Sequence, residues 1–104
     1  MKNDFYTFTS WKVKDNNQEE FLHLWETDFA PAFIKLNPYS NVTLINSLEN
    51  PNVYYSFGPW INPEQMQSAR ASYEYRSAFS KLVSLCDEAK SGSFRNILSI
   101  SGSK

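Results

Sequence analysis

Four side chains in the second half of the chain could together bind and stabilise an aromatic anion. Trp60 carries an indole N–H and Asn62 an amide N–H, and both groups donate hydrogen bonds. Tyr73 adds a phenol and Arg76 a fixed positive charge. Donors and a cation stabilise a developing phenolate or enolate when they converge in a water-excluded pocket. We therefore take Trp60, Asn62, Tyr73 and Arg76 as the candidate catalytic residues.

Each of these four residues also has a structural interpretation. Trp60 ends an aromatic segment and could simply fill a core, while Asn62 stands directly before Pro63, where a helix cap is expected. Tyr73 and Arg76 could flank a core with their polar tips in water. The surrounding elements must therefore decide which interpretation applies.

Alternating rings and β-branched residues predict a first strand over Phe5–Val13 and a third strand over Val53–Trp60. A second strand is predicted over Val42–Leu48, joined to the third by the turn 49–52. The pattern at 94–100 predicts the fourth strand.

The first helix is predicted to start at Asn16, with Glu19 completing an N-terminal capping pair, and to end at Asn37-Pro38. Pro31 lies inside this helix and supplies no backbone N–H, so we expect a kink or a fresh turn beginning near Asp28.

A second helical region is predicted from Pro63 as far as Lys90, with room for a break around Ser68–Ser72 and a stop at Gly92. Cys86 falls on its core-facing stripe, which indicates buried packing. The resulting order, βαββαβ, is that of an α+β ferredoxin-like fold with a four-stranded antiparallel sheet and helices on one face.

Large rings project from both faces of the predicted sheet. Neighbours along a strand point to opposite faces, so Tyr55 and Phe57 lie on one face of the third strand, and Tyr54 and Trp60 on the other. Two helices cover only one face, and an apolar face left in water is unusual for a monomer. The sequence therefore predicts a homodimer that packs sheet to sheet through the open face.

Composition excludes several classes of partner. The 104 residues carry 10 Lys and Arg against 11 Asp and Glu without a basic run, so we expect one domain over 1–104 that binds no nucleic acid. No apolar stretch is long enough for a membrane span. The single cysteine and the absence of a signal segment predict a cytoplasmic protein. One histidine, His23, leaves no multi-histidine metal site, and no glycine-rich phosphate loop is present.

Several segments in order resemble the antibiotic biosynthesis monooxygenase superfamily of dimeric α/β barrels. They are the strand end Trp11-Lys12-Val13, the helix start from Glu19 to Trp25, the aromatic strand that ends at Trp60, and Tyr73-Glu74-Tyr75-Arg76. The resemblance implies a cleft between sheet and helices in each subunit. It also implies oxidation of a small aromatic or polyketide-like substrate by O2 without a cofactor, since some members catalyse this reaction.

Other members of that superfamily degrade haem, and many have no known activity. Trp60 matches a tryptophan of the haem-degrading branch, but Arg70 stands where that branch has a histidine, and the strand 5–13 contains no asparagine. The resemblance therefore favours cofactor-free oxygenation over haem degradation, with no cofactor and no metal expected.

Two alternatives remain open from the sequence. A non-catalytic dimer of the same fold could bind a small ligand or serve in assembly, because a fold does not confer an activity. An RNA-recognition module shares the βαββαβ order and stacks bases on exposed rings, for which Tyr6, Phe8, Tyr55 and Phe57 would serve. The segment 42–60 contains no basic residue, which disfavours the RNA-binding module.

Overall fold

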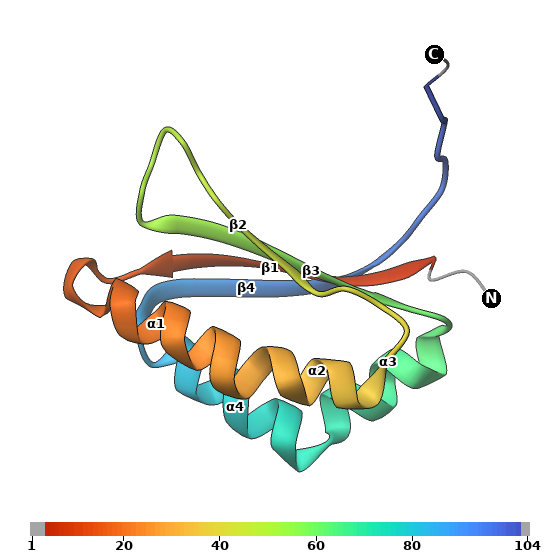
Figure 1. The fold of residues 1–104 in the computed structure, drawn as a ribbon, viewed down its shortest axis with the longest axis horizontal. Helices are drawn as coiled ribbons and strands as arrows, with labels where there is room; N and C mark the ends of the chain where they lie inside the picture. Colours follow the sequence, from red (N-terminus) through yellow and green to blue (C-terminus); the bar gives the residue numbers. More distant parts are fainter. Residues whose placement is uncertain (1–3, 103–104) are drawn as a thin grey trace.

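The computed structural model describes residues 4–102, which form one antiparallel sheet covered by helices on a single face (Figure 1). The strands are β1 (Phe5–Val13), β2 (Thr43–Asn46), β3 (Val53–Trp60) and β4 (Cys86–Arg95), arranged in the order β2-β3-β1-β4. With the helices between them, this is the α+β ferredoxin-like arrangement predicted from the sequence.

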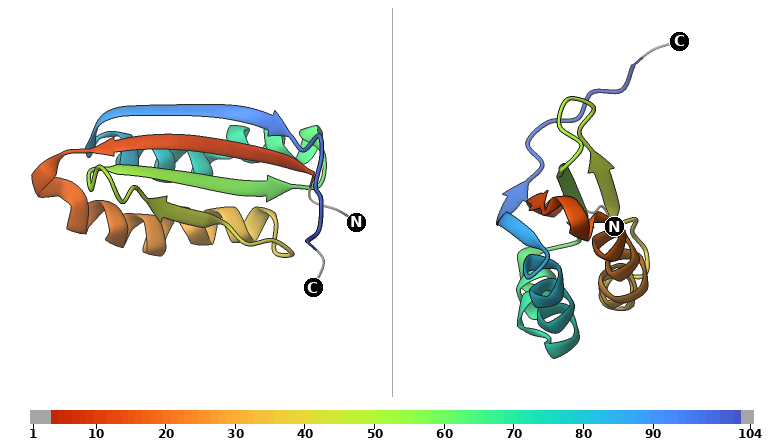
Figure 2. Two further views of the ribbon diagram at one scale, coloured as in Figure 1. Left: turned by 90° about the horizontal axis from the view of Figure 1, so that it is seen from above. Right: turned by 90° about the vertical axis from the view of Figure 1, so that its left-hand side faces the viewer.

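The helices form two columns that run side by side beneath the sheet (Figure 2). The first column contains a 3-10 turn (Asp15–Asn17), α1 (Gln18–Leu24), a π-helical turn (Trp25–Phe29) and α2 (Ala30–Leu36). The second column contains α3 (Pro63–Ala71) and α4 (Tyr73–Val83). No helix within residues 4–102 is long and apolar enough to cross a membrane.

The π-helical turn lies where Pro31 was expected to disturb the first helix. Pro31 has no N–H to bond to the preceding turn, so the regular ladder is interrupted before it and a new α-helix begins at Ala30. The expectation of a fresh turn near Asp28 is confirmed, and so is the helix end at Asn37-Pro38. The expected cap at Asn16 is wrong, because Asn16 lies inside the 3-10 turn and α1 starts without a side-chain cap.

The core lies between the sheet and the helices and is built mainly of rings. Trp11 is central: its ring lies 5.4 Å from that of Phe21, 6.4 Å from Phe29 and 5.2 Å from Phe79. Its indole N–H donates to the Ser56 hydroxyl at 2.9 Å, so this buried polar group has a hydrogen-bond partner. Rings from both helical columns therefore meet on one residue of the middle strand.

The second half of the chain differs from the sequence prediction in the position of its last strand. The helical region ends at Val83 and not near Lys90, and β4 occupies Cys86–Arg95 in place of the predicted 94–100. Gly92 is consequently a strand residue opposite Phe8 and not a helix stop. The expected break is confirmed, because Ser72 separates the two helices and its hydroxyl accepts the Tyr75 N–H at 3.3 Å.

Backbone pairing explains where β4 begins. The Leu85 carbonyl accepts the Lys14 N–H at 3.1 Å and an amide N–H of Asn17 at 3.4 Å, which fixes the turn after α4. Cys86 pairs with Val13 and, after a bulge at Asp87, Glu88–Arg95 pair with β1 without interruption. This ladder outweighs the helical pattern of the side chains. Residues 96–102 continue beyond the strand on the helix-free side of the sheet (Figure 1).

Two smaller predictions are also corrected. The second strand is shorter than predicted, since only Thr43–Asn46 pairs with β3. The helical spacing of apolar residues in the first helix also predicts a core-facing Leu22, but Leu22 is 44% exposed, while Phe21 takes the buried position beside Trp11.

The close approach of α2 to β3 gives a test of the packing. A Cβ added at Gly58 would overlap the ring of Phe33, which is itself held against Trp60 with ring centroids 4.3 Å apart. We predict that Gly58→Ala lowers the free energy of unfolding by about 1–3 kcal/mol, because the ring has no free space to move into. Gly102→Ala is the matched control, since nothing lies within 4 Å of the added Cβ. Equal urea midpoints for the two variants would contradict this packing.

Candidate functional site

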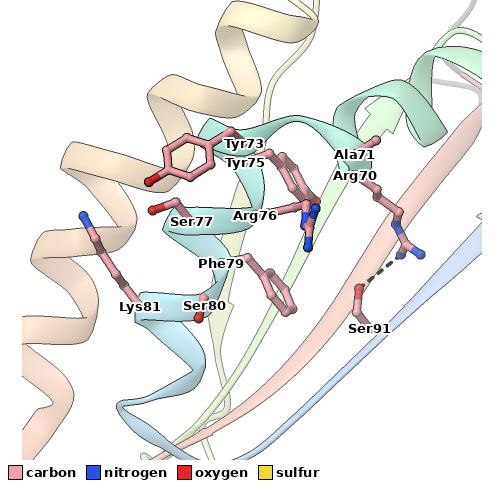
Figure 3. Close-up of a pocket in the computed structure, with 10 residues that line it drawn as sticks. All are labelled: Arg70, Ala71, Tyr73, Tyr75, Arg76, Ser77, Phe79, Ser80, Lys81 and Ser91. Carbon is pink, nitrogen blue, oxygen red and sulfur yellow. Dashed lines mark hydrogen bonds between the residues drawn. The ribbon is translucent and has the colours of Figure 1, made fainter.

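An open cleft of about 760 Å³ lies between the second helical column and the sheet. Figure 3 shows the lining side chains, which come from the end of α3, from α4 and from the middle of β4. The lining consists of aromatic, cationic and hydroxyl groups: Arg70, Ala71, Tyr73, Tyr75, Arg76, Ser77, Phe79, Ser80, Lys81 and Ser91.

Two of the four candidate residues line this cleft. Tyr73 and Arg76 stand three residues apart at the start of α4. Figure 3 shows that Tyr73 points toward the first helical column, while Arg76 lies beside Tyr75 on the side of the sheet. Tyr73 is 83% exposed, and Arg76 is exposed as well. Both residues therefore stand at the edge of the cleft.

The other two candidates have structural positions outside the cleft lining. Trp60 is 0% exposed, packs against Phe33, and donates its indole N–H to the Thr7 hydroxyl at 3.3 Å. Asn62 caps α3, because its side-chain oxygen accepts the Gln65 N–H at 2.7 Å. The structure therefore does not bring the four candidates together in one wall.

A row of hydroxyl groups connects the core to the cleft. Thr9 donates to the Ser91 hydroxyl at 3.1 Å, and the Arg70 guanidinium donates to the same oxygen at 3.2 Å. Since that oxygen accepts two hydrogen bonds, the Ser91 O–H is left to donate toward the cleft. Figure 3 shows Arg70 turned toward Ser91 across the gap between α3 and β4.

Tyr75 forms the inner wall of the cleft. Its ring lies 5.1 Å from that of Phe29 and is buried, so only part of the side chain faces the cleft. Burial raises the pKa of the Tyr75 phenol above 10.0, although a hydrogen bond with Thr7 and the charge of Arg70 act in the opposite direction. The phenol therefore stays protonated at neutral pH and can serve as a hydrogen-bond donor.

The cleft contains residues that the sequence analysis did not select. Tyr75 and Phe79 fall on the core-facing stripe predicted for the second helical region, and they pack in the core while also facing the cleft. Arg70 was noted only for replacing a histidine. Ser91 could not be found from the sequence, because the strand that carries it was predicted as the end of a helix.

No metal site is evident in the described part of the chain. Within residues 4–102, no three His, Cys, Asp or Glu side chains cluster closely enough to hold an ion. His23 is exposed on α1, on the side away from the core, as expected. The neighbouring Asp28 has its pKa lowered, chiefly by a hydrogen bond from Lys81.

Comparisons with known proteins support the fold. Neither the protein-family models nor the curated proteins give a match. Among solved structures, a variant of SnoaB, a cofactor-independent oxygenase from Streptomyces nogalater, superposes with a TM-score of 0.85 at 16% identity, over 97% of this chain and 100% of that one.

Two further structures are similar over nearly the whole chain. One is a candidate antibiotic biosynthesis monooxygenase from Deinococcus radiodurans, with a TM-score of 0.81 at 14% identity over 96% of this chain and 99% of that one. The other is a candidate antibiotic biosynthesis monooxygenase from Bordetella bronchiseptica, with a TM-score of 0.78 at 17% identity over 93% of this chain and 100% of that one. These proteins share the fold of this chain, which is the fold of the antibiotic biosynthesis monooxygenase structures.

Cys86, the only cysteine, provides a test of the chemistry at the start of β4. Burial and, secondarily, the Asp87 carboxylate raise the pKa of its thiol from 9.0 to about 11, and the thiol donates to the Leu82 carbonyl at 3.3 Å. Because only the thiolate is alkylated, we predict that iodoacetamide at about pH 8 modifies the folded protein roughly 100-fold more slowly than the urea-unfolded chain. The rate should keep increasing with pH well above 9.0. Mass spectrometry of timed samples measures this, and equal rates in both states would show that the thiol is not shielded.

Proposed function

We propose that this protein is a cofactor-independent monooxygenase that oxidises a small, electron-rich aromatic substrate in the cleft between α4 and the sheet. The observation that carries the proposal is the lining of that cleft. Arg76 lies beside a ring wall made by Tyr75 and Phe79, with Tyr73 at the rim of the cleft, which combines a surface for a flat substrate with groups that stabilise its anion (Figure 3). Its fold is also that of a cofactor-independent oxygenase.

The proposed reaction uses the substrate itself as the reductant of O2. An anthrone-type substrate loses a proton to water, since no carboxylate or imidazole among residues 4–102 lines the cleft, and becomes an enolate. The enolate transfers one electron to O2, forming a substrate radical and superoxide. The two radicals combine into a peroxide anion at the ring carbon, and this anion takes up a proton from water to become a hydroperoxide. Loss of water then breaks the O–O bond, so that one oxygen atom remains as a new carbonyl and the other leaves as water.

Each lining group has a role in this sequence. The Arg76 charge favours the enolate over the neutral substrate, which lowers the free energy of proton loss. The phenols of Tyr73 and Tyr75 donate hydrogen bonds to the developing oxyanion. Trp60 and Asn62 act at a distance in this proposal: Trp60 holds Thr7 beneath the cleft, and Asn62 fixes the start of α3.

A second candidate function is ligand binding without catalysis. The exposure of Tyr73 favours it, because a reactive enolate needs a site from which water is excluded. Trp60 and Asn62 also have complete structural roles without any substrate. Oxygen consumption separates the two functions, since a binding protein would hold the aromatic compound without oxidising it.

We also propose that the protein is a homodimer that packs through the helix-free face of the sheet. Phe8 lies at the centre of this face, with ring centroids 5.9 Å from Tyr55, 6.4 Å from Phe57 and 5.9 Å from Phe94. Phe94 and Ile45 add further exposed apolar surface on the same side. Monomers rarely leave a contiguous apolar surface of this kind in water.

Two projections flank the open face and support the same assembly. The β2–β3 turn and the segment after β4 both rise on the side away from the helices, at opposite ends of the sheet (Figure 1). Each carries exposed apolar residues, namely Leu48 in the turn and Ile97, Leu98 and Ile100 in the terminal segment. A second copy seated on the sheet would fit between them and cover these side chains.

The catalytic proposal predicts oxygen uptake in a mixture of the pure protein and anthrone, above the rate of the same mixture without protein. Replacing Arg76 by Gln should lower kcat/KM about tenfold or more, because the enolate loses the charge that stabilises it. Arg95→Gln is the matched control: Arg95, on β4, is exposed like Arg76 on α4, but it does not line the cleft. Saturable binding of anthrone without oxygen uptake would instead establish the binding function.

The assembly proposal predicts that the protein sediments as a dimer at micromolar concentration. Phe8→Glu should weaken the dimer at least about tenfold, because association would bury the new carboxylate among rings. Leu22→Glu places the same charge on a side chain of similar exposure, 44% against 36% for Phe8, on the helical side of the molecule. It should leave the dimer intact. A monomeric wild-type protein would overturn the proposal.

A further inference from the structure

The charge of the cleft differs from that of the whole chain. The chain has 10 Lys and Arg against 11 Asp and Glu, a net charge of −1. The cleft, in contrast, is lined by Arg70, Arg76 and Lys81 and by no carboxylate among the described residues. A cluster of one sign on a nearly neutral protein attracts a ligand of the opposite charge.

Only two of these three cations are available to a ligand. Lys81 is held by Asp28 at 3.1 Å, on the side that faces the first helical column. Arg70 contacts the neutral hydroxyl of Ser91, and within residues 4–102 neither Arg70 nor Arg76 forms an ion pair. Arg70 therefore keeps most of its five N–H donors, and Arg76 keeps all of its own for a ligand.

The positions of the two guanidinium groups suit a planar anion. Figure 3 shows Arg76 beside Tyr75 on one side of the cleft and Arg70 turned toward Ser91 on the other, so both groups border the same space. Two like charges around one space repel each other, and an anion between them removes that cost. A guanidinium binds a carboxylate with two parallel hydrogen bonds, whereas neutral hydroxyl ligands leave its charge unbalanced.

The remaining walls of the cleft require an apolar body on the ligand. Phe79 is half-buried and Tyr75 is buried, and the two rings form the inner wall of the cleft beside Arg76. An inorganic anion would leave this ring surface in water, while an aromatic ring covers it.

We infer that the cleft binds an aromatic carboxylate, with the carboxylate held by Arg70, Arg76 and the Ser91 hydroxyl and the ring packed on Tyr75 and Phe79. This inference deepens the proposed function, on which it rests for the reaction, because it assigns the substrate a permanent negative charge in addition to the ring that is oxidised. The carboxylate group stays unchanged in the reaction and serves only to orient the ring.

The test compares two probes that share a ring and differ in charge. We predict that 9-anthracenecarboxylate, followed by its fluorescence, binds at least about tenfold more tightly than neutral 9-anthracenemethanol. Added salt should weaken the binding of the carboxylate and leave the binding of the neutral alcohol unchanged. Arg70→Gln and Arg76→Gln should each remove this preference, while Arg95→Gln should retain it. Near-UV circular dichroism of each variant confirms that its core is intact.

Two results would overturn the inference: equal affinity for the two probes, or the same loss of preference in Arg95→Gln as in the cleft variants. The binding measurement involves no turnover, so it can fail independently of the oxygenase proposal. If the protein prefers 9-anthracenecarboxylate but consumes no oxygen, the result supports the anion site and contradicts the catalytic function. If oxygen uptake is equal for neutral and carboxylated anthrones and is unaffected by Arg70→Gln, the result contradicts the anion site and supports the catalytic function.

Discussion

The architecture depends on hydroxyl groups buried on the helix-facing side of the sheet. Thr7, Thr9 and Ser56 are all nearly inaccessible to water, and a buried hydroxyl without a hydrogen-bond partner is strongly destabilising. Their partners are side chains on neighbouring strands: Trp60 donates to Thr7, Trp11 donates to Ser56, and Ser91 accepts from Thr9. Satisfying these three groups positions two of the three core tryptophans, Trp11 and Trp60, together with one wall of the cleft.

This requirement connects the core to the candidate site. Because Ser91 is held by Thr9 on the middle strand, it stands at a fixed place opposite α3, where Arg70 reaches it. Tyr75 approaches the same row from α4, with its ring against Phe29 of the other column. A change to the hydroxyl row would therefore alter the cleft before it altered the fold, since the ring contacts around Trp11 do not pass through Ser91.

The sequence predicted the first two thirds of the fold because local signals and tertiary pairing agree there. The alternation over β1 and β3, the cap at Asn62 and the interruption before Pro31 are all properties of short segments. The last strand was misplaced for two reasons. Cys86–Arg95 is rich in Asp, Glu, Lys and Ser, which disfavour strands, and its residues continue the helical spacing of the preceding helix. Only the pairing with β1, a contact between the two ends of the chain, makes this segment a strand.

The same cause limited the prediction of the site. Tyr73 and Arg76 could be selected because their place on the flank of a helix follows from the helical period alone. Ser91 and its link to Arg70 depend on the register of β4, so no local pattern reveals them. Trp60 was selected for its residue type at a strand end, yet the alternation of the strand directs it into the core against Phe33. The role of all four residues in catalysis stays a prediction.

The charges on the helices distinguish a structural from a functional explanation of the cleft. Where a cation on this surface serves packing, the chain supplies an acid: Lys35 of α2 meets Glu74 of α4 at 2.9 Å, and Lys81 meets Asp28 at 3.1 Å. Both pairs join the two helical columns and lie on the side of α4 away from β4. On the other side of the same helix, Arg76 faces Arg70 across the cleft, and the lining supplies no acid to either residue. Folding gains nothing from two unbalanced cations in one cleft, so their presence is better explained by an anionic ligand than by stability.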